Sequence, residues 1–423
     1  MPELTLSSAL DAARRQSPEL RAAREAVVAA SARARQAGVL RNPLFSYGRE
    51  QTSASGVTSS QDIAELQQPL ELGGQRSARL DAARLRVRAA EARLDEARSE
   101  VDLTVVRAYV LAVAAERRAQ LADQAHDAFV QAQRASDRRL AAGDVSGYAA
   151  RRLRLESARH AAMRAEAALS RSSARRALTS LMGQSARSAI TLVLPIGVAQ
   201  TGIGDSVPLR LDDDSLTALA TRRRAELRAA TLDAEAAAAD ARLVSRERIP
   251  VPVLSAGYKR ERVTTDGSPA SGSASGFVAG IEIPLAILDR REGAVAASAA
   301  DARRALAELD ALRRRISREV ADAAESVRAA EQQRDALAPH VGESTRVAMR
   351  AVQTSYAEGE ITLVEWLDAV RAWQDAESTI ATLEAEVIVR RAALARAAGL
   401  PILPNSDSGG ADASAVPPRT NRP

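Results

Sequence analysis

The chain contains no cysteine in its 423 residues, which excludes disulfide bonds, thiolate chemistry, cysteine-ligated zinc and a lipid-modified cysteine. Aromatic residues make up only 2% of the sequence, which is low for a globular core because these side chains normally supply much of the buried area. No stretch approaches about 18 consecutive apolar residues, so no transmembrane helix is expected. Residues 1–6 also lack the charged and apolar regions of a signal peptide. What remains is rich in Ala, Arg, Glu and Leu, a composition that favours closely packed helices over a compact enzyme.

Blocks of charge of one sign are nearly absent from the chain. The 59 basic and 54 acidic residues leave a net charge of +5, but they alternate at helical spacing, as they do between Glu91 and Glu100. Nucleic-acid sites need clustered basic charge together with stacking aromatics. We therefore expect solvated helix faces and no nucleic-acid partner.

Signatures of enzyme chemistry are missing as well. The sequence has no phosphate-binding loop, nucleophile elbow or HExxH motif. His126, His160 and His340 have no ligand partners nearby, whereas a metal site needs three or four converging groups. Each histidine is expected on a helix surface, and we expect no catalytic residue, no cofactor and no bound metal.

The sequence is a tandem duplication, because the same features recur in the same order about 207 to 216 residues apart. The correspondences are SPELRAA at 17–23 with RAELRAA at 224–230, Asn42-Pro43 with Ile249-Pro250, Gln68-Pro69-Leu70 with Ile283-Pro284-Leu285, Gly143 with Gly359, and Gly183 with Gly399. The pattern predicts a first repeat over 1–215, a second over 216–402, and a disordered tail over 403–423. Within the first, 184–215 reads as an irregular connector with one strand-like run at 190–194.

Each repeat is expected to contain one helix of about 70 residues, or roughly 100 Å. Apolar residues recur every seven positions in both, as in a coiled-coil seam; they are Leu80, Val87, Leu94 and Val101, then Val295, Ala302, Leu309 and Ile316. Only Pro339 interrupts, and it should bend the second helix. Gly143 and Gly359 should close helical hairpins as left-handed caps, followed by helices of about 40 residues. A further, shorter helix in each repeat should end near Leu40 and near Arg248.

Residues 43–69 and 250–284 change to a period of two, which predicts two β-hairpins. Their strands of about nine to eleven residues would be long enough to cross a bilayer, with polar loops at 52–60 and 264–276. A small surface hairpin is the alternative, although these hairpins have an apolar face that nothing else in the chain covers. The hairpin aromatics are expected either to face lipid or its interface, or to pack within the strands; they are Phe45, Tyr47, Tyr258 and Phe277.

Two hairpins supply four strands, which cannot close a barrel, yet a membrane sheet must have no open edge. Chains must therefore pool strands. Two chains would give eight strands with a filled interior, and three would give twelve around a lumen. The expected fold is mainly α with membrane β-hairpins, assembled as a homotrimer with a 12-strand β-barrel on a 12-column α-barrel.

Two motifs give the chain a family resemblance over about residues 4–402. QPLELGGQR at 68–76 and IPLAILDRREG at 283–293 resemble the strand-to-helix junctions of TolC-like outer-membrane efflux proteins, in the heavy-metal (CzcC/CusC-like) branch. The junction residues are Pro69, Gly73, Gly74, Pro284, Asp289 and Gly293. That branch usually has a motif closer to PLPIFDRNQG, from which Ala286, Leu288, Arg291 and Glu292 depart. The resemblance implies a passive exit duct of a tripartite (RND-type) efflux system, carrying substrate such as heavy-metal cations out of the periplasm.

A third motif, running from Tyr356 to Ala369, is similar to the periplasmic tip of that family. The resemblance implies a gate in which Glu365 and Asp368 form an acidic ring and Tyr356 ties the tip helices together. Alternatively, the two acids only begin an ascending helix, where they complement its dipole. Adaptor contact is implied at the hairpin tips, at Gly143, Asp144, Gly359 and Glu360. The first tip departs from the family pattern at Gly147 and Ala149. Trp366 and Trp373 are expected to pack at the seam.

The implied location is the outer membrane of a Gram-negative cell, extending into the periplasm, which requires export. We expect a mature or truncated chain, since no signal peptide is present. The implied partners are a periplasmic adaptor (membrane fusion) protein, an inner-membrane pump and outer-membrane lipid. Two other readings stay open: a soluble coiled-coil scaffold, which leaves the hairpins unexplained, and the periplasmic adaptor of such a pump, which has one helical hairpin where this chain has two.

Overall fold

The computed structural model of the protein describes residues 3–184, 191–193, 212–267 and 271–403. The chain divides into two compact units, each built from segments that are far apart in the sequence. The first unit draws on residues 1–22, 95–225 and 313–423, and the second on residues 23–94 and 226–312. Both repeats therefore contribute to both units.

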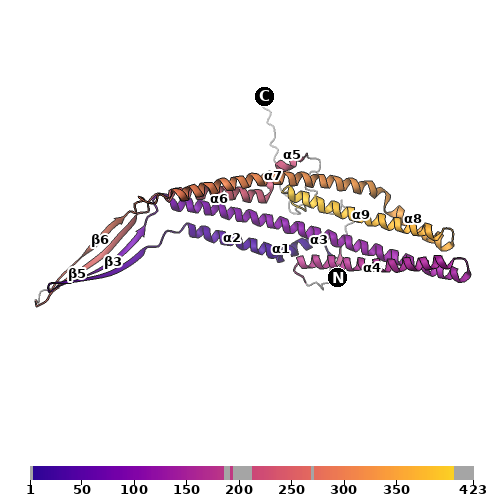
Figure 1. Cartoon of the computed structure of the whole chain (residues 1–423), viewed down its shortest axis with the longest axis horizontal. Helices are drawn as coiled ribbons and strands as arrows, with labels where there is room; N and C mark the ends of the chain where they lie inside the picture. Colours follow the sequence, from indigo (N-terminus) through magenta and orange to yellow (C-terminus); the bar gives the residue numbers. More distant parts are fainter. Residues whose placement is uncertain (1–2, 185–190, 194–211, 268–270, 404–423) are drawn as a thin grey trace, which may run out of the picture. The chain divides into compact units, whose positions relative to one another are not determined.

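The second unit contains the β-sheet and the helices next to it (Figure 1). Its helices are α2 (Pro18–Ala37), the start of α3 (Gln75–Ala142), α6 (Ala225–Arg246) and the start of α7 (Glu292–Leu337). Alanines let α3 and α6 approach closely, because Ala89, Ala92 and Ala229 are buried against each other with Leu232. Arg86 and Arg93 of α3 also form ion pairs with Asp240 and Asp233 of α6.

The sheet joins both hairpins into one antiparallel set of strands. The strands are β2 (Leu44–Ala54), β3 (Val57–Pro69), β5 (Val253–Thr265) and β6 (Ser271–Glu282), in that spatial order. The prediction of two hairpins is confirmed, and the pairing of β3 with β5 places the hairpins side by side (Figure 1). Within the described residues, β2 and β6 are the edges of this sheet.

The polar segments predicted as hairpin loops mostly continue the strands instead. The first hairpin turns through only Ser55 and Gly56, whose φ angles are 52° and 81°. Two consecutive positive φ angles match a type I′ turn, whose twist suits tight hairpins. Polar residues such as Thr52 and Ser60 pair within the ladder, so β2 and β3 run for 11 and 13 residues. The alternation of apolar and polar residues ends before the strands do, because Ser and Thr occupy both faces near the turn. The sequence therefore predicted strands that are too short.

The strand starts also correct the alignment of the two repeats. β2 begins directly after Pro43 and β5 directly after Pro252. Pro43 therefore corresponds to Pro252, two residues later than the predicted match with Pro250. The residue before a proline favours extended backbone, so the sequence alone did not show whether Pro250 or Pro252 precedes the strand.

The first unit contains the helical hairpins, where the long helices turn back. Its elements are α1 (Leu6–Gln16), α4 (Gly147–Leu181), α5 (Asp213–Arg223), α8 (Glu343–Glu358), α9 (Leu363–Ala397) and the rest of α3 and α7. The left-handed caps are confirmed, with φ of 84° at Gly143 and 85° at Gly359. Strand β4 (Thr191–Leu192) pairs in parallel with β1 (Glu3–Leu4), inside the run predicted at 190–194. Most of the predicted connector and almost all of the predicted tail lie outside the described residues.

The two long helices differ, contrary to the prediction of one continuous helix in each repeat. Helix α3 runs unbroken for 68 residues, or about 100 Å at 1.5 Å per residue. Its counterpart ends at Leu337, where a short 3-10 turn, η2 (Ala338–His340), leads into α8. Pro339 lacks the amide that would continue the helix, and Gly342 has a φ of 134° that other residues avoid. Together they break the helix where only a bend was expected.

The helices before the hairpins are also divided. α1 and α2 are separated at Ser17, and α5 and α6 at the corresponding Arg224. Ser17 Oγ accepts a hydrogen bond from the Leu20 amide at 3.1 Å and so begins α2 as well as ending α1. The ends of α2 at Ala37 and α6 at Arg246 lie close to the predicted positions.

The seven-residue repeat marks buried positions more sharply in the second repeat than in the first. Leu309 and Ile316 are buried, whereas Leu80, Val87 and Leu94 are only half-buried. In the first repeat the fully buried residues of the same stretch are alanines, including Ala82 and Ala89. A spacing of seven residues therefore also holds in the first repeat, but there the most deeply buried positions are alanines.

Candidate functional site

The turn between α8 and α9 is fixed by caps on both sides. Gly359 ends α8, and a side chain there would lie 3.1 Å from Arg139 Nη2 of α3. Ser355 Oγ donates a hydrogen bond to the Glu360 carboxylate at 2.8 Å. Helix α9 then begins after Thr362. Glycine at position 359 is needed for its left-handed backbone conformation, and the Arg139 guanidinium lies close beside it.

Glu365 forms a capping box at the start of α9. The Thr362 amide and hydroxyl both donate to Glu365 Oε2 at 2.8 Å, and the Glu365 amide donates to Thr362 Oγ1 at 3.3 Å. The hydrogen bond from the Thr362 backbone lowers the pKa of Glu365. Asp368 lies one turn later on the same helix face and is exposed. The two predicted gate acids are thus neighbours, but the Glu365 carboxylate is engaged in starting the helix.

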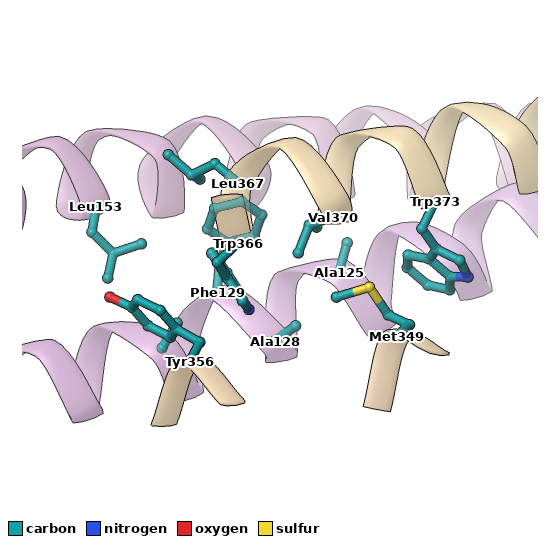
Figure 2. Packing of buried hydrophobic residues seen from close by; sticks show 11 residues of the cluster. Ala125, Ala128, Phe129, Leu153, Met349, Tyr356, Trp366, Leu367, Val370 and Trp373 are labelled. Atoms are coloured by element: carbon teal, nitrogen blue, oxygen red, sulfur yellow. The ribbon is translucent and has the colours of Figure 1, made fainter. Parts of the chain in front are cut away.

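Beneath this turn lies an aromatic cluster drawn from four helices (Figure 2). Trp366 of α9 is only 1% exposed and stacks on Tyr356 of α8, with ring centroids 5.2 Å apart. Its other neighbour, Phe129 of α3, meets it edge-on at 4.9 Å. Phe129 in turn stacks on His160 of α4 at 3.9 Å. Trp373 belongs to the same cluster, so the prediction that both tryptophans pack at the seam is confirmed.

His160 is buried, so the prediction of a surface histidine was wrong at this position. Its side chain is covered by Phe129, and burial lowers its pKa, with Glu156 opposing that shift. The local spacing of residues around His160 gave no sign of burial, because the covering ring comes from a different helix, α3. Burial also raises the pKa of Tyr356, against the positive charge of Arg139. His340 is exposed, as predicted.

The first tip, between α3 and α4, has the same plan with different residues. Gly143 takes the left-handed conformation, and the Asp144 amide donates to Arg139 O at 2.9 Å. Ser146 Oγ then accepts from the Ala149 amide at 3.2 Å and begins α4. Asp144 is exposed. Arg139 closes this turn by its carbonyl, and its side chain lies beside Gly359 of the second tip.

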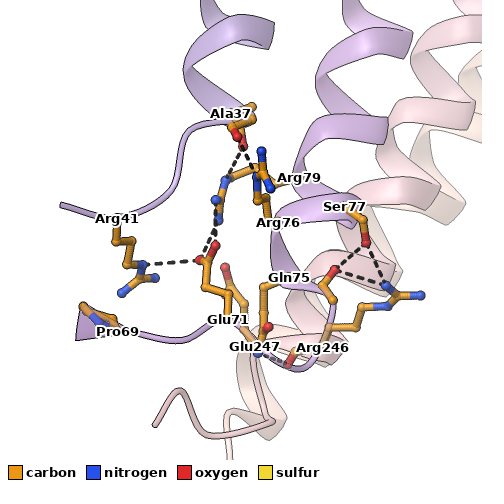
Figure 3. Close-up of polar contacts among 12 residues, drawn as sticks. Ala37, Arg41, Pro69, Glu71, Gln75, Arg76, Ser77, Arg79, Arg246 and Glu247 are labelled. Carbon is orange, nitrogen blue, oxygen red and sulfur yellow. Dashed lines mark hydrogen bonds and ion pairs between the residues drawn. The ribbon is translucent and has the colours of Figure 1, made fainter. Parts of the chain in front are cut away.

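The first strand-to-helix junction is held by a carboxylate between two arginines (Figure 3). The guanidinium of Arg79 donates to both Glu71 oxygens at 3.0 Å, and Arg41 approaches the same carboxylate at 3.3 Å. Arg79 Nε also donates to Ala37 O at 3.0 Å, at the end of α2. The hydrogen bond from Arg79 lowers the pKa of Glu71. The junction is therefore clamped to the helix that leads into the hairpin.

The same junction also packs against the end of α6. Gln75 is 2% exposed and donates through Nε2 to Arg246 O at 3.2 Å and to Ile249 O at 3.1 Å. A side chain at Gly73 would place its Cβ 2.9 Å from Ile249, and Gly74 has a φ of 73°. The structure thus gives a physical reason for each of these predicted junction glycines.

The second junction, which follows Pro284, is more open. Asp289 Oδ1 accepts from the Arg291 amide at 2.7 Å, and Arg291 forms an ion pair with Glu247 at 2.6 Å. Arg291 has a φ of 55° just before α7, where the first junction has Gly74. A side chain at Gly293 would meet nothing within 4 Å. Gly293, unlike Gly73, has no steric requirement within the described chain.

The four hairpin aromatics lie on one face of the sheet. Paired residues of an antiparallel ladder point to the same side, and the register links Tyr47 through Ala64 to Tyr258 and then to Phe277. Phe45 lies two residues from Tyr47 and shares its side. Tyr258 and Phe277 meet edge-on at 5.9 Å, and Phe277 is 92% exposed. The part of this face next to the helices is apolar and uncovered in the described chain, whereas toward the hairpin turns the same face carries Arg49, Asp62 and Arg260.

Two absences apply to the described residues. Among them, no helix is both long and apolar enough to cross a membrane. In the same part of the chain, no group of three or more His, Cys, Asp or Glu residues is arranged to hold a metal ion.

The chain is similar to a known protein family, to one relative over part of its sequence, and to several solved structures in fold. The family model for outer membrane efflux protein matches residues 9–184 and 216–400. The cobalt-zinc-cadmium resistance protein CzcC of Cupriavidus metallidurans is 33% identical over 155 residues, which is 37% of this chain and 36% of that relative. The match therefore spans about a third of the relative's length.

Solved structures superpose over almost the whole chain. The channel CusC gives a TM-score of 0.75 at 18% identity, covering 94% of this chain and 93% of its own. The outer-membrane channel OprN gives 0.72 at 23% identity, covering 94% and 91%. The open state of the MtrE channel of Neisseria gonorrhoeae gives 0.68 at 20% identity, covering 94% and 89%. These likenesses establish the fold, and the family model matches most of both repeats. The chain belongs to the outer membrane efflux protein family.

Proposed function

We propose that three copies of the chain form an exit duct through the outer membrane. The main support is the four-stranded sheet, which bears exposed apolar residues on one face next to the helices. Its edge strands β2 and β6 each lack a neighbour on the outer side in the described chain. A sheet in lipid must satisfy its edge amides and carbonyls, so β2 and β6 need strands from other copies. Three copies supply twelve strands, enough to surround a lumen. The apolar part of the face, which carries Phe45, Tyr47, Tyr258 and Phe277, then contacts lipid.

The helices continue this duct into the periplasm. At about 100 Å, α3 has the length needed to reach far from the membrane. The tips at Gly143, Asp144, Gly359 and Glu360 are the surfaces offered to a periplasmic adaptor, which connects the duct to an inner-membrane pump. The duct itself is passive: it conducts whatever substrate the pump delivers.

The gate is proposed at the start of α9. Asp368 is exposed, so three copies would bring three such carboxylates around one aperture, where they attract cations and repel each other. Glu365 adds its charge beside them, although its carboxylate is also the cap of α9. Tyr356 acts indirectly, because it holds α8 against Trp366 and so fixes where α9 begins.

Heavy-metal cations are the proposed cargo. Support comes from the similarity to a cobalt-zinc-cadmium resistance protein, which covers about a third of that protein. The acidic residues at the proposed gate suit a cationic cargo electrostatically. Organic cations are the alternative that the same charges would admit.

The test is restoration of metal resistance in a Gram-negative host that lacks its own outer-membrane efflux duct. The chain is expressed, with an export signal, alongside a matching pump and adaptor. Growth in cobalt, zinc and cadmium salts should return toward the resistant level. If export of organic cations is restored without any gain in metal resistance, organic cations replace heavy metals as the cargo. A correctly inserted chain that restores neither would contradict the efflux role.

A further inference from the structure

The two hairpins are built to one register, which allows their strands to be superposed residue by residue. Leu44 of β2 pairs with Gln67 of β3, and Val253 of β5 pairs with Glu282 of β6. If Leu44 is matched to Val253 and Gln67 to Glu282, each later pair of the first hairpin falls on a pair of the second. The match holds as far as Ala54 with Val57, which falls on Val263 with Gly272.

One further pairing joins the hairpins to each other. β3, the second strand of its hairpin, pairs with β5, the first strand of the next. Within this pairing Leu66 lies opposite Ala256, and Gln67 lies opposite Ser255. The chain then ends its sheet at β6, which is again the second strand of a hairpin. If this order of strands continues, the next neighbour of β6 is the first strand of a hairpin, and β2 of another copy is such a strand.

We propose that β6 of one protomer pairs with β2 of the next in the register that places Ile281 opposite Tyr47 and Glu282 opposite Ser46. In the superposed hairpins, Leu66 of β3 matches Ile281 of β6, and Ala256 of β5 matches Tyr47 of β2. The pairing of Leu66 with Ala256 therefore becomes the pairing of Ile281 with Tyr47. The proposal rests on the proposed trimer and deepens it, because it names the residues that close the sheet between copies.

At the end of the strands next to the helices, the register pairs apolar residues with each other. It sets Ile283 opposite Phe45 and Ile281 opposite Tyr47, whereas farther along the same face Phe277 comes opposite Gln51. A slip of one residue would bring Ile281 opposite Ser46, and would turn the apolar side chains of one strand to the polar face of its neighbour. Slips of one are therefore disfavoured, and only slips of two residues keep the faces matched.

A glycine in β2 supports the same pairing. Gly257 of β5 lies so close to β3 that a side chain there would come within 2.6 Å of Ala64 O. Its counterpart in the superposed hairpins is Gly48 of β2, where a side chain would meet nothing within 4 Å in this chain. Glycine in a strand interior lowers stability unless another backbone approaches closely. In the proposed register that approach comes from the next protomer, whose Ala279 stands where Ala64 stands beside Gly257.

Disulfide trapping tests the register directly, because the chain has no cysteine of its own. Two in-register double variants are used, Tyr47→Cys with Ile281→Cys and Ser46→Cys with Glu282→Cys. The off-register variants pair Tyr47→Cys with Ile283→Cys or with Ala279→Cys. Directly opposite residues lie about 4.5 to 5.5 Å apart between Cα atoms, within disulfide reach, whereas diagonal ones lie about 7 to 8 Å apart.

The in-chain counterparts give a matched control for cysteine reactivity and folding. Leu66→Cys with Ala256→Cys, and Gln67→Cys with Ser255→Cys, occupy the equivalent positions and should form disulfides inside one chain. Their mass on a non-reducing gel stays that of the monomer. Single-cysteine variants report random collision between copies. All variants are oxidised mildly in intact outer membranes.

We expect covalent dimers and trimers from the in-register pairs, at least about tenfold more than from the off-register pairs. Stronger cross-linking of an off-register pair, with control pairs that oxidise, would overturn the register and leave the trimer standing. A native mass of three chains with no cross-link from any inter-copy pair would also overturn it. A native mass of one chain would overturn the trimer itself.

Discussion

Phe129 of α3 stacks on His160 of α4 with ring centroids 3.9 Å apart, and this contact buries the imidazole inside the tip of the helical unit. The same phenylalanine meets Trp366, so the histidine is coupled to the packing that positions α9. An ionisable group in this place makes the tip sensitive to pH.

The first prediction concerns acidification. Burial lowers the pKa of His160, so the unfolded chain takes up a proton at a higher pH than the folded one. The free energy of unfolding should therefore fall as the pH drops below the ordinary histidine value of about 6.5. Glu156 opposes the shift, while Arg159, Arg371 and His126 reinforce it.

The measurement is thermal unfolding of the assembled protein between about pH 8 and pH 5, beside the variant His160→Gln and the matched control His340→Gln at an exposed site. His160→Gln should lower stability at neutral pH and flatten the pH dependence. An equal slope in both variants and the parent chain would contradict the assignment.

The second prediction concerns the clamp at the first junction. Glu71→Gln removes the charge that Arg79 and Arg41 share, and it should cost about 1 to 3 kcal/mol of unfolding free energy. Because Arg79 lowers the pKa of Glu71, the clamp is complete above the usual glutamate range and is lost as the pH falls through the lowered value. Denaturant unfolding checks both statements. Arg41→Ala is the control, since that more exposed arginine should cost under about 1 kcal/mol, and equal losses would argue against Arg79 as the main partner.

The third prediction compares two glycines of the junctions. Gly73→Ala should destabilise the protein by about 1 to 3 kcal/mol, because its Cβ would lie 2.9 Å from Ile249. Gly293→Ala should be neutral or slightly stabilising, because it opens α7 with free space around it. Thermal unfolding of the two variants decides between them. If Gly73→Ala leaves the stability unchanged, the end of α6 does not hold the first junction.

The fourth prediction separates the roles of the tip acids. Asp368→Asn should raise single-channel conductance in planar bilayers, because it removes the carboxylates that hold cations in the proposed aperture and so obstruct it, without touching a cap. Thr362→Ala should instead weaken the start of α9 by about 1 kcal/mol through loss of the capping box. The double variant Glu365→Ala with Asp368→Ala should raise conductance too. Unchanged conductance in Asp368→Asn and in the double variant would remove the gate from this position.

Much of the fold could be predicted because duplication displays each feature twice. The repeated glycines Gly143 and Gly359 predicted the positions of the helical tips. The change from a helical period to a period of two predicted the two β-hairpins. The mainly helical fold with a few strands is confirmed by the structure and by its likeness to solved channels. The prediction of an outer-membrane efflux protein, rather than an enzyme, is confirmed by the family match.

What sequence reasoning missed depends on contacts between residues far apart in the chain. Phe129 and His160 lie on different helices, and Gln75 and Ile249 lie on different repeats, so no local pattern linked them. The break at Pro339 was underestimated because its effect depends on Gly342, three residues later. The capping box of Thr362 and Glu365 was readable in advance, since a threonine followed three residues later by a glutamate begins many helices.

Copies of this chain are proposed to close a conducting duct. Native mass measurement of the detergent-extracted protein, followed by planar-bilayer recording of the same fraction, tests this assembly. We expect a complex of three chains of 44.8 kDa each, with discrete conductance steps that Asp368→Asn enlarges. A folded single chain that inserts no channel would contradict it.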